Sequence, residues 1–387
     1  MLSLLLFLNS EILIYVLVIY FLLKNSFVEE EYSLMVKMTD INFWMILLVL
    51  LLYLMMLSVE ISFKFSFNLL IFSLIYLMWV SNFMVFYFLY EMVFVLIMFV
   101  IILLGYSYER LMAAYLMMFY SFLFSSPMMM LFLIFDCVFL MKSWLMYGLV
   151  VSYFLVASFM VKFPIFGFHY WLPVAHVEAS TIGSMLLAGI LLKLGSVGLF
   201  YVVVYLNFMV KFHWLSISML LVMLLILLLS DLKMMIAYSS IAHMSMVFYV
   251  MMLGSLVAKK GALLMMFYHG FLSPLMFWLV GLLAWWKTRS LFVVKFMSVS
   301  FIFFFLIFIL SILNMSFPPF MGFLSEILMM KSLVTIKFIM YTFIVGVLFS
   351  CYYNIYFFWA FASSMGYLFK INFYSLDVFI FLLWVIF

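Results

Sequence analysis

Long, uninterrupted runs of apolar residues recur along this chain and limit the folds that it can adopt. An α-helix needs about 20 such residues to cross the roughly 30 Å hydrocarbon core of a bilayer. The runs that approach or exceed that length are 1–23, 41–59, 67–81, 83–106, 111–135, 144–166, 181–206, 214–230, 235–254, 261–286, 297–334, 339–362 and 372–387. Because lipid offers the backbone no hydrogen-bond partner, each run is expected to be helical. The sequence therefore predicts an all-α polytopic membrane protein with about 13 transmembrane helices.

The composition excludes several other classes of protein. Hydrophobic residues make up 72% of the chain, charged residues 8%, and the mean hydropathy is +1.45. Soluble domains carry about 25% charged residues, so a water-soluble fold is excluded. The net charge of +4 is spread over 387 residues without a basic patch, and no nucleic-acid partner is expected. Cys137 and Cys351 form neither a CxxC pair nor a metal-ligand spacing.

Prolines interrupt two of the apolar runs. The run 297–334 is too long for one straight helix, and it contains SFPPF at 316–320. The other interruption follows the uncharged stretch SYFLVASFMV (152–161), where Pro164 and Pro173 flank a short aromatic segment. Proline removes a backbone donor and clashes with the preceding turn. We therefore expect a broken helix at each place.

Ionisable side chains inside apolar runs are the main candidates for function. Each costs about 2.5–3.5 kcal/mol at the centre of a helix in a bilayer, and such residues commonly mark ion or proton pathways. They are Glu11, Glu91, Lys162, Lys193, His243, His269, Glu326 and Lys331. The proton affinity of a buried lysine depends on whether a carboxylate lies beside it, so a lysine with a movable acidic partner is a proton switch. The set without Glu11 and Lys331, which are weaker candidates, predicts a proton relay.

Each candidate also has a purely structural interpretation. A lone carboxyl such as Glu91 can be satisfied by a neighbouring helix, and Lys162 lies close enough to a break to extend its amine towards water. A buried histidine is often only a hydrogen-bonded core residue. The sequence contains no phosphate-binding loop, dinucleotide fingerprint or metal-ligand cluster, so we expect no cofactor in this chain.

Several motifs make the chain resemble a known family. The longest is KFPIFGFHYWLPVAHVEASTIGSMLLAGILLKLGSVG at 162–198, and the others are ERLMAAYLMMFYSFLFSSP (109–127), DLKMMIAYSSIAHMSMV (231–247), HGFLSPLMF (269–277) and FPPFMGFLSE (317–326). Over roughly 80–380 the chain is similar to the subunit 4 family of mitochondrial NADH:ubiquinone oxidoreductase, or respiratory complex I. Val174, Ser180 and Tyr201 depart from the family's usual lysine, proline and arginine. These departures concern loop contacts more than the relay.

This resemblance implies a fold and a set of roles. The family fold has two inverted five-helix repeats, each with a discontinuous helix, and a relay that moves protons across the membrane. Carried over by position, Glu91 and Lys162 match the family's acid–lysine pair, Lys193 its central lysine, His243 and His269 its central histidines, and Glu326 the acid on the second broken helix. Glu91 lies on the fourth predicted span rather than the fifth, which implies the loss of an N-terminal helix. The segment around Trp171 is expected to be an amphipathic connection, with the indole at the membrane interface.

The same resemblance implies the setting. The expected domains are N-terminal transmembrane helices at 1–80, an antiporter-like proton-translocating core at 81–362, and a C-terminal transmembrane helix at 363–387. The expected partners are other complex I membrane-arm subunits, sibling antiporter-like subunits and lipids such as cardiolipin. FMN, iron–sulfur clusters and ubiquinone are expected only in partner subunits. The high content of Phe, Met and Tyr suggests an AT-rich organellar genome, hence a multi-pass protein of the mitochondrial inner membrane that is encoded in the mitochondrial genome.

The sequence leaves two alternatives to complex I open. A subunit of a multi-subunit cation/proton antiporter would use the same acid–lysine chemistry. A structural scaffold that has lost its pump would not be expected to retain Glu91, Lys162, Lys193 and Glu326. The enzymatic expectation is a subunit of a proton-translocating NADH:ubiquinone reductase, with no redox chemistry in this chain.

Overall fold

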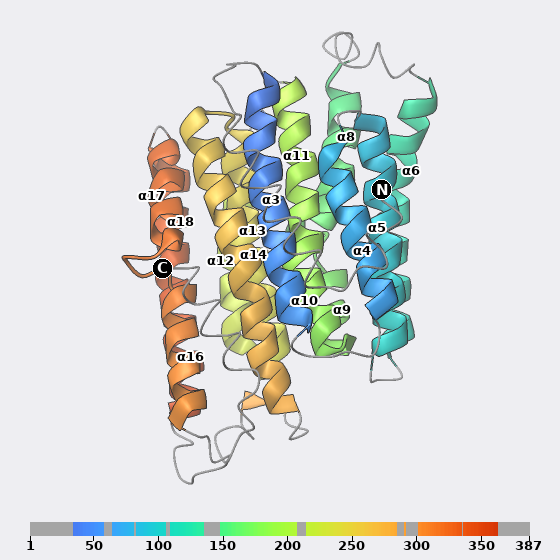
Figure 1. Cartoon of the computed structure of the whole chain (residues 1–387). Helices are drawn as coiled ribbons and strands as arrows, with labels where there is room; N and C mark the ends of the chain where they lie inside the picture. The colour runs from blue at the N-terminus through green and yellow to red at the C-terminus, as the bar shows by residue number, and fades with distance from the viewer. Residues whose placement is uncertain are drawn as a thin grey trace, which may run out of the picture. The chain divides into compact units, whose positions relative to one another are not determined.

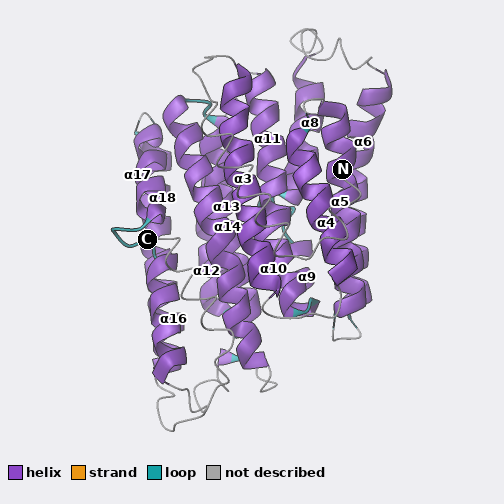
Figure 2. Cartoon of the chain, in the orientation of Figure 1, coloured by secondary structure: helices purple, strands orange, loops and turns teal. Residues whose placement is uncertain are grey.

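The computed structural model describes most of the chain as α-helices (Figure 2). The described residues are 34–57, 64–80, 83–105, 109–134, 148–206, 214–284, 290–291, 301–334 and 336–362. The chain divides into two compact units, residues 1–93 and 94–387. Apart from one isolated bridge between Asp231 and Ser290, the regular structure of the described residues is helical.

The first unit contains α3 (Leu34–Leu57), α4 (Lys64–Trp79) and the beginning of α5 (Phe83–Leu104). Helices α3 and α4 pack against each other. Their contact includes a hydrogen bond from the Tyr53 hydroxyl to Asn68 Oδ1 at 2.9 Å. A polar pair of this kind satisfies both side chains between apolar helices and helps to fix how they pack.

The second unit begins within α5 and contains the other described helices. These are α6 (Arg110–Ile134), α8 (Gly148–Lys162), α9 (Trp171–Glu178), α10 (Thr181–Leu186), the π-helical turn η1 (Leu187–Leu191), α11 (Leu192–Leu206), α12 (Trp214–Leu228), α13 (Leu232–Met252), α14 (Leu256–Ala284), α16 (Phe301–Asn314), α17 (Met321–Leu333) and α18 (Lys337–Ala362). In Figure 1, α6 and α8 lie at one end of this unit, and α16, α17 and α18 lie at the other. Helices α13 and α14 pack together between these ends, and α14 contacts both η1 and α17.

The helices follow the apolar runs of the sequence closely. Every predicted span between 41–59 and 339–362 overlaps a described helix, while the predicted spans 1–23 and 372–387 lie outside the described residues. Six helical segments are long and apolar enough to cross a membrane: 84–104, 110–130, 181–203, 232–252, 256–282 and 337–361. The chain is therefore a multi-pass membrane protein, as its apolar runs predict.

Both predicted interruptions are present in the second unit. Helix α8 ends at Lys162, two residues before Pro164, and the next helix begins only at Trp171. Gly167 in this connection has φ +101°, a backbone conformation that glycine adopts without strain. Helix α16 ends at Asn314, and α17 begins at Met321 after the two prolines. Each break leaves helix-end carbonyls without their usual intrahelical partners.

Candidate functional site

Lys193 lies deep inside the second unit, next to an irregular turn of its own helix. The segments α10, η1 and α11 follow one another without a gap, and the π-helical turn Leu187–Leu191 ends two residues before Lys193. The Lys193 ammonium donates a hydrogen bond to the Ala188 carbonyl at 2.5 Å. A π-helical turn perturbs the regular hydrogen-bond ladder and is common at functional sites. Here it provides a backbone acceptor for a side chain that is only 1% exposed.

Two histidines, His269 and His243, lie next to Lys193 in the interior of the unit. Lys193 Nζ lies 3.0 Å from His269 Nδ1, although 76 positions separate these residues in the sequence. When Lys193 is protonated its ammonium can only donate, so in that state Nδ1 is the acceptor and the neutral His269 ring carries its hydrogen on Nε2. The His269 and His243 rings lie 5.6 Å apart, centroid to centroid. Three of the six proposed relay residues, from α11, α13 and α14, therefore meet in one buried cluster.

Lys162 is the last residue of α8 and is also buried, with 2% of its surface exposed. Its ammonium lies 4.7 Å from the centre of the Phe94 ring, within the range of a cation–π contact. Helix α11 approaches the broken end of α8 closely, because a Cβ atom on Gly195 would lie only 3.2 Å from the Phe163 backbone nitrogen. The glycine of the LLKLG motif therefore lets the helix of Lys193 pack directly on the backbone next to Lys162.

Trp171 stabilises this first break from inside the protein. Its indole N–H donates a hydrogen bond to the Val161 carbonyl at 2.9 Å, which satisfies a group at the end of α8. The ring also packs edge-on against Phe94, with 6.2 Å between the centroids. Because Trp171 is 1% exposed and nearly all of α9 is buried, the predicted interfacial indole and amphipathic connection are wrong. The indole instead meets a hydrogen-bonding need that the helix break creates.

The second break has a comparable arrangement around Glu326. The Tyr268 hydroxyl donates to the Leu313 carbonyl at 2.6 Å, at the end of α16. A Cβ atom on Gly322 would lie 2.5 Å from the Tyr268 ring, so this glycine allows α17 to approach α14. Ser316, in the left-handed region with φ +53°, places its side chain beside the Glu326 carboxyl group, where the two interact. Glu326 is 8% exposed and thus faces the interior of the unit.

The sequence also singles out three other ionisable residues, Glu91, Glu11 and Lys331. Glu91 is half-buried on the part of α5 that belongs to the first unit, so its pairing with Lys162 of the second unit stays a prediction. Glu11 lies outside the described residues. Lys331 is exposed in the last turn of α17, which agrees with a lysine extending towards a helix end. The domain boundaries at 80 and 362 also stay predictions.

Sequence reasoning missed two buried basic groups near the central cluster. Lys233 is 5% exposed, and its ammonium donates to the Ala179 carbonyl at 2.9 Å, at the end of α9. His176 is fully buried and stacks on Phe277, with 4.4 Å between the centroids and 6° between the planes. Both residues lie in motifs quoted above, but each flanks an apolar run rather than interrupting it. A search restricted to charges within the runs therefore passes over them.

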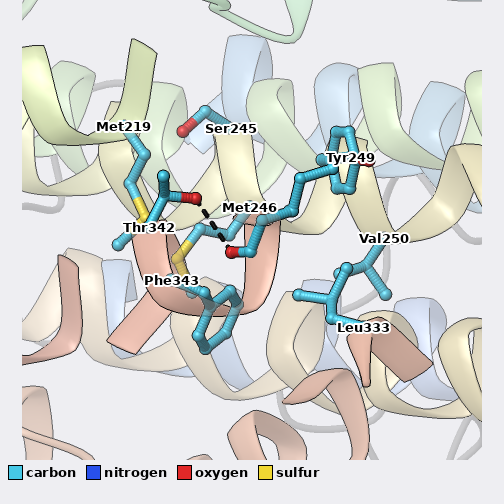
Figure 3. A pocket seen from close by; sticks show the side chains of 9 residues that line it. Met219, Ser245, Met246, Tyr249, Val250, Leu333, Thr342 and Phe343 are labelled. Atoms are coloured by element: carbon cyan, nitrogen blue, oxygen red, sulfur yellow. Dashed lines mark hydrogen bonds between the residues drawn. The ribbon is translucent and has the colours of Figure 1, made fainter. Parts of the chain in front are cut away.

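A small cavity lies between α12, α13, α17 and α18. Its volume is about 20 Å³, enough for one water molecule. Met219, Ser245, Met246, Tyr249, Val250, Leu333, Ile339, Thr342 and Phe343 line it. Figure 3 shows the hydrogen bond that occupies the Thr342 hydroxyl, which donates to the Ile339 carbonyl at 2.8 Å. The Tyr249 hydroxyl is buried and has no protein partner among the described residues. Within the part of the chain that the structure describes, no group of three or more His, Cys, Asp or Glu side chains could hold a metal ion.

Comparisons with solved structures agree with this fold. The chain is similar to a subunit of respiratory complex I from Thermus thermophilus, with a TM-score of 0.77 and 20% identity over 90% of this chain and 79% of that one. It is also similar to a chain of the archaeal membrane-bound sulfane sulfur reductase, with a TM-score of 0.74 and 16% identity over 89% of this chain and 77% of that one. At these identities, the likeness establishes the fold alone.

Sequence comparisons establish the family. The family model described as NADH:quinone oxidoreductase/Mrp antiporter, transmembrane, matches residues 80–351. The chain is 35% identical to the NADH-ubiquinone oxidoreductase chain 4 of Ascaris suum over 74% of its own length and 72% of that protein. It is 36% identical to the chain of the same name from Caenorhabditis elegans over 65% of its own length and 63% of that protein. The chain therefore belongs to the NADH:quinone oxidoreductase/Mrp antiporter family and, within it, to the NADH-ubiquinone oxidoreductase chain 4 group.

Proposed function

We propose that this chain is a membrane-arm subunit of respiratory complex I that translocates protons as electrons pass from NADH to ubiquinone elsewhere in the complex. The names of its relatives support the assignment to that complex. The observation that carries the proton-translocating role is the buried contact between Lys193 Nζ and His269 Nδ1 at 3.0 Å. A proton donor and a proton acceptor held at this distance inside a bilayer are suited to proton transfer.

The central step of the proposed relay is a transfer from Lys193 to His269. After the transfer, Lys193 is a neutral amine that can donate or accept a hydrogen bond. His269 is an imidazolium, whose two ring nitrogens both carry a hydrogen. The Nε2 proton can then pass to His243 through an intervening water, since the ring centroids are 5.6 Å apart. Because the cluster is buried, each charge is felt strongly by its neighbours, and the position of one proton biases the next.

Lys162 is proposed to control this step from the first break. Its backbone packs against Gly195, two residues from Lys193, so the end of α8 that carries Lys162 lies beside the helix that carries Lys193. In this proposal the charge of Lys162 acts on the central cluster through the buried protein between them. Glu91 is proposed as the movable partner of Lys162. When the carboxylate approaches, it stabilises the protonated lysine, and when it withdraws, Lys162 repels positive charge at Lys193.

Glu326 is proposed as the terminal acid of the relay, at the second break. Its contact with Ser316 holds the carboxyl group at the interrupted segment between α16 and α17. The two breaks, each with an aromatic donor on a helix-end carbonyl, support an arrangement of two related repeats of the type used by transporters. In this proposal the repeats have inverted topology, and about 13 helices cross the membrane.

The proposed setting follows from the same assignment. The chain would lie in the mitochondrial inner membrane, be encoded in the mitochondrial genome, and contact sibling antiporter-like subunits, other membrane-arm subunits and lipids such as cardiolipin. FMN, iron–sulfur clusters and ubiquinone would be bound by partner subunits. The chain would thus share in an oxidoreductase reaction by moving protons, without carrying an electron itself.

The alternative function is a subunit of a multi-subunit cation/proton antiporter, because the family model spans both classes. The chain 4 relatives make this the less favoured assignment. Purification of the native assembly distinguishes the two. Complex I predicts co-purifying flavin and iron–sulfur clusters, together with NADH-driven proton uptake into vesicles. An assembly without redox centres that exchanges a metal cation for protons would refute the proposal.

A further inference from the structure

A buried network of neutral polar side chains lies between the histidine pair and the second helix break. Asn314 is the last residue of α16, Tyr353 and Asn354 lie on α18, and Ser239 lies on α13. Asn314 Nδ2 donates to Asn354 Oδ1 at 2.8 Å and to the Tyr353 hydroxyl at 3.3 Å. The Tyr353 hydroxyl lies 3.5 Å from Ser239 Oγ. All four side chains are buried, with Asn354 fully enclosed.

The hydrogen bonds of this network run in one direction. Asn354 Nδ2 donates to the Ser350 carbonyl at 2.8 Å, which turns its Oδ1 towards Asn314. Since the Asn314 amide is a donor to Tyr353, the hydroxyl hydrogen of Tyr353 must point away from it. Ser239 gives its own hydrogen to the Ile236 carbonyl at 2.8 Å, so Ser239 can only accept from Tyr353. The Tyr353 hydroxyl is therefore a donor aimed at α13.

Each end of the network lies close, along its own segment of chain, to a part of the proposed relay. Ser239 lies four residues before His243, one turn away on the same face of α13. Both ring nitrogens of His243 are buried and have no protein partner within the described parts of the chain. Buried polar atoms of this kind are normally satisfied by ordered water. At the other end, Asn314 lies two residues before Ser316, whose side chain interacts with the Glu326 carboxyl group.

We propose that Tyr353 is a positioning residue of the proton relay. Its hydroxyl, oriented by Asn314 and Asn354, donates to a water beside His243, and that water then directs its own hydrogens towards the imidazole and the second break. The 3.5 Å contact with Ser239 is long for a bond between hydroxyl groups, so Ser239 aims the Tyr353 hydroxyl at α13 while leaving its hydrogen free to be shared with such a water. This role rests on the proposed proton-translocating function.

A purely structural role makes a different prediction. Buried asparagines also hold helices together in lipid, and Asn314 and Asn354 join α16 to α18. If the network only holds these helices, removing the Tyr353 hydroxyl lowers thermal stability and leaves proton transfer unchanged. If the hydroxyl orients a water in the relay, its removal slows proton translocation while the complex remains assembled.

The test uses the intact complex reconstituted into vesicles, with the initial rate of NADH-driven proton uptake and the rate of NADH oxidation with an uncoupler as the two readouts. Tyr353→Phe is expected to reduce proton uptake roughly tenfold, which is less than the ~10²–10⁴-fold that a group transferring the proton itself contributes, because Tyr353 only orients the water. The uncoupled oxidation rate is expected to stay normal. Tyr352→Phe is the matched control, since Tyr352 is the neighbouring residue on α18 and is 59% exposed.

Ser239 provides a second, independent pair of variants. Ser239→Ala removes the acceptor that keeps the Tyr353 hydroxyl aimed at α13 and at the proposed water, so it is expected to slow proton uptake. Ser239→Thr keeps a hydroxyl and is expected to restore it. Full proton uptake in Tyr353→Phe overturns the inference, and if that variant does not assemble, full uptake in Ser239→Ala overturns it. The proposed function fails separately, when Lys193→Met pumps normally. If Lys193→Met abolishes pumping and Tyr353→Phe does not, the proposed function stands and only the positioning role of Tyr353 is wrong.

Discussion

Lys193 Nζ and His269 Nδ1 lie 3.0 Å apart in the interior of the second unit, and the same ammonium donates to the Ala188 carbonyl of its own helix. This relationship joins α11 to α14 and depends on the π-helical turn that directs the Ala188 carbonyl towards the lysine.

The Trp171 indole and the Tyr268 hydroxyl each donate to a helix-end carbonyl at a break, and removing either donor should destabilise the protein. Trp171→Phe leaves the Val161 carbonyl without its partner, and Tyr268→Phe does the same at Leu313. An unsatisfied buried acceptor costs about 1–3 kcal/mol, so both variants are expected to lower the thermal unfolding midpoint of the complex. Tyr249→Phe is the control, because it removes a buried hydroxyl with no protein partner among the described residues. If that control destabilises as much as the other two, the carbonyl contacts do not support the breaks.

Gly195→Ala should disturb the packing of the two lysine-bearing helices. The added methyl group would lie 3.2 Å from the Phe163 backbone nitrogen and 3.3 Å from the Lys162 carbonyl carbon, and backbone cannot turn away as a side chain can. Overpacking of a core typically costs about 1–3 kcal/mol, which should appear as less assembled complex in native gels. In Gly346→Ala the methyl group meets the flexible tip of Met219 instead, so assembly should be retained. Equal assembly of both variants would contradict the close approach of α11 to the first break.

Two substitutions at Ser316 should separate backbone strain from side-chain function. Ser316→Gly relieves the left-handed conformation, while Ser316→Ala keeps it, so the glycine variant should be more stable by about 1–2 kcal/mol. Both lose the hydroxyl contact with Glu326, and both should slow proton uptake to a similar degree. Thermal unfolding and proton uptake in the same preparations test the two effects. Normal uptake in both variants would remove the Ser316 hydroxyl from the relay.

Glu91 and Lys162 should behave as one functional unit. Glu91→Gln and Lys162→Met are each expected to impair proton uptake, because either change removes the proposed acid–lysine switch. The double variant should be no worse than the more severe single variant, since interacting residues give non-additive effects. Initial rates of proton uptake in the three reconstituted variants provide the comparison. Fully additive losses would indicate that the two residues act independently.

The parts of this fold that follow from local sequence were predicted well. Lipid forces each long apolar run into a helix, and the prolines at 164 and 318–319 mark where α8 and α16 cannot continue. Contacts between residues that are far apart in the sequence cannot be predicted from local sequence patterns. The π-helical turn before Lys193 has no proline to signal it, and the partners of Tyr353 lie 39 and 114 positions away in the sequence. The predicted interfacial position of Trp171 is wrong for a related reason, because its indole donates to a carbonyl that only the folded helix break leaves unpaired.

The most direct test of the account is proton translocation by the reconstituted complex with Lys193→Met. Methionine keeps a long apolar side chain but removes the amine that contacts His269 and Ala188. Lys260→Met is the matched control, since Lys260 is exposed near the start of α14. We expect the Lys193 variant to assemble with little NADH-driven proton uptake, and the control to pump normally. Full proton uptake with methionine at position 193 would contradict the central role of the Lys193–His269 contact.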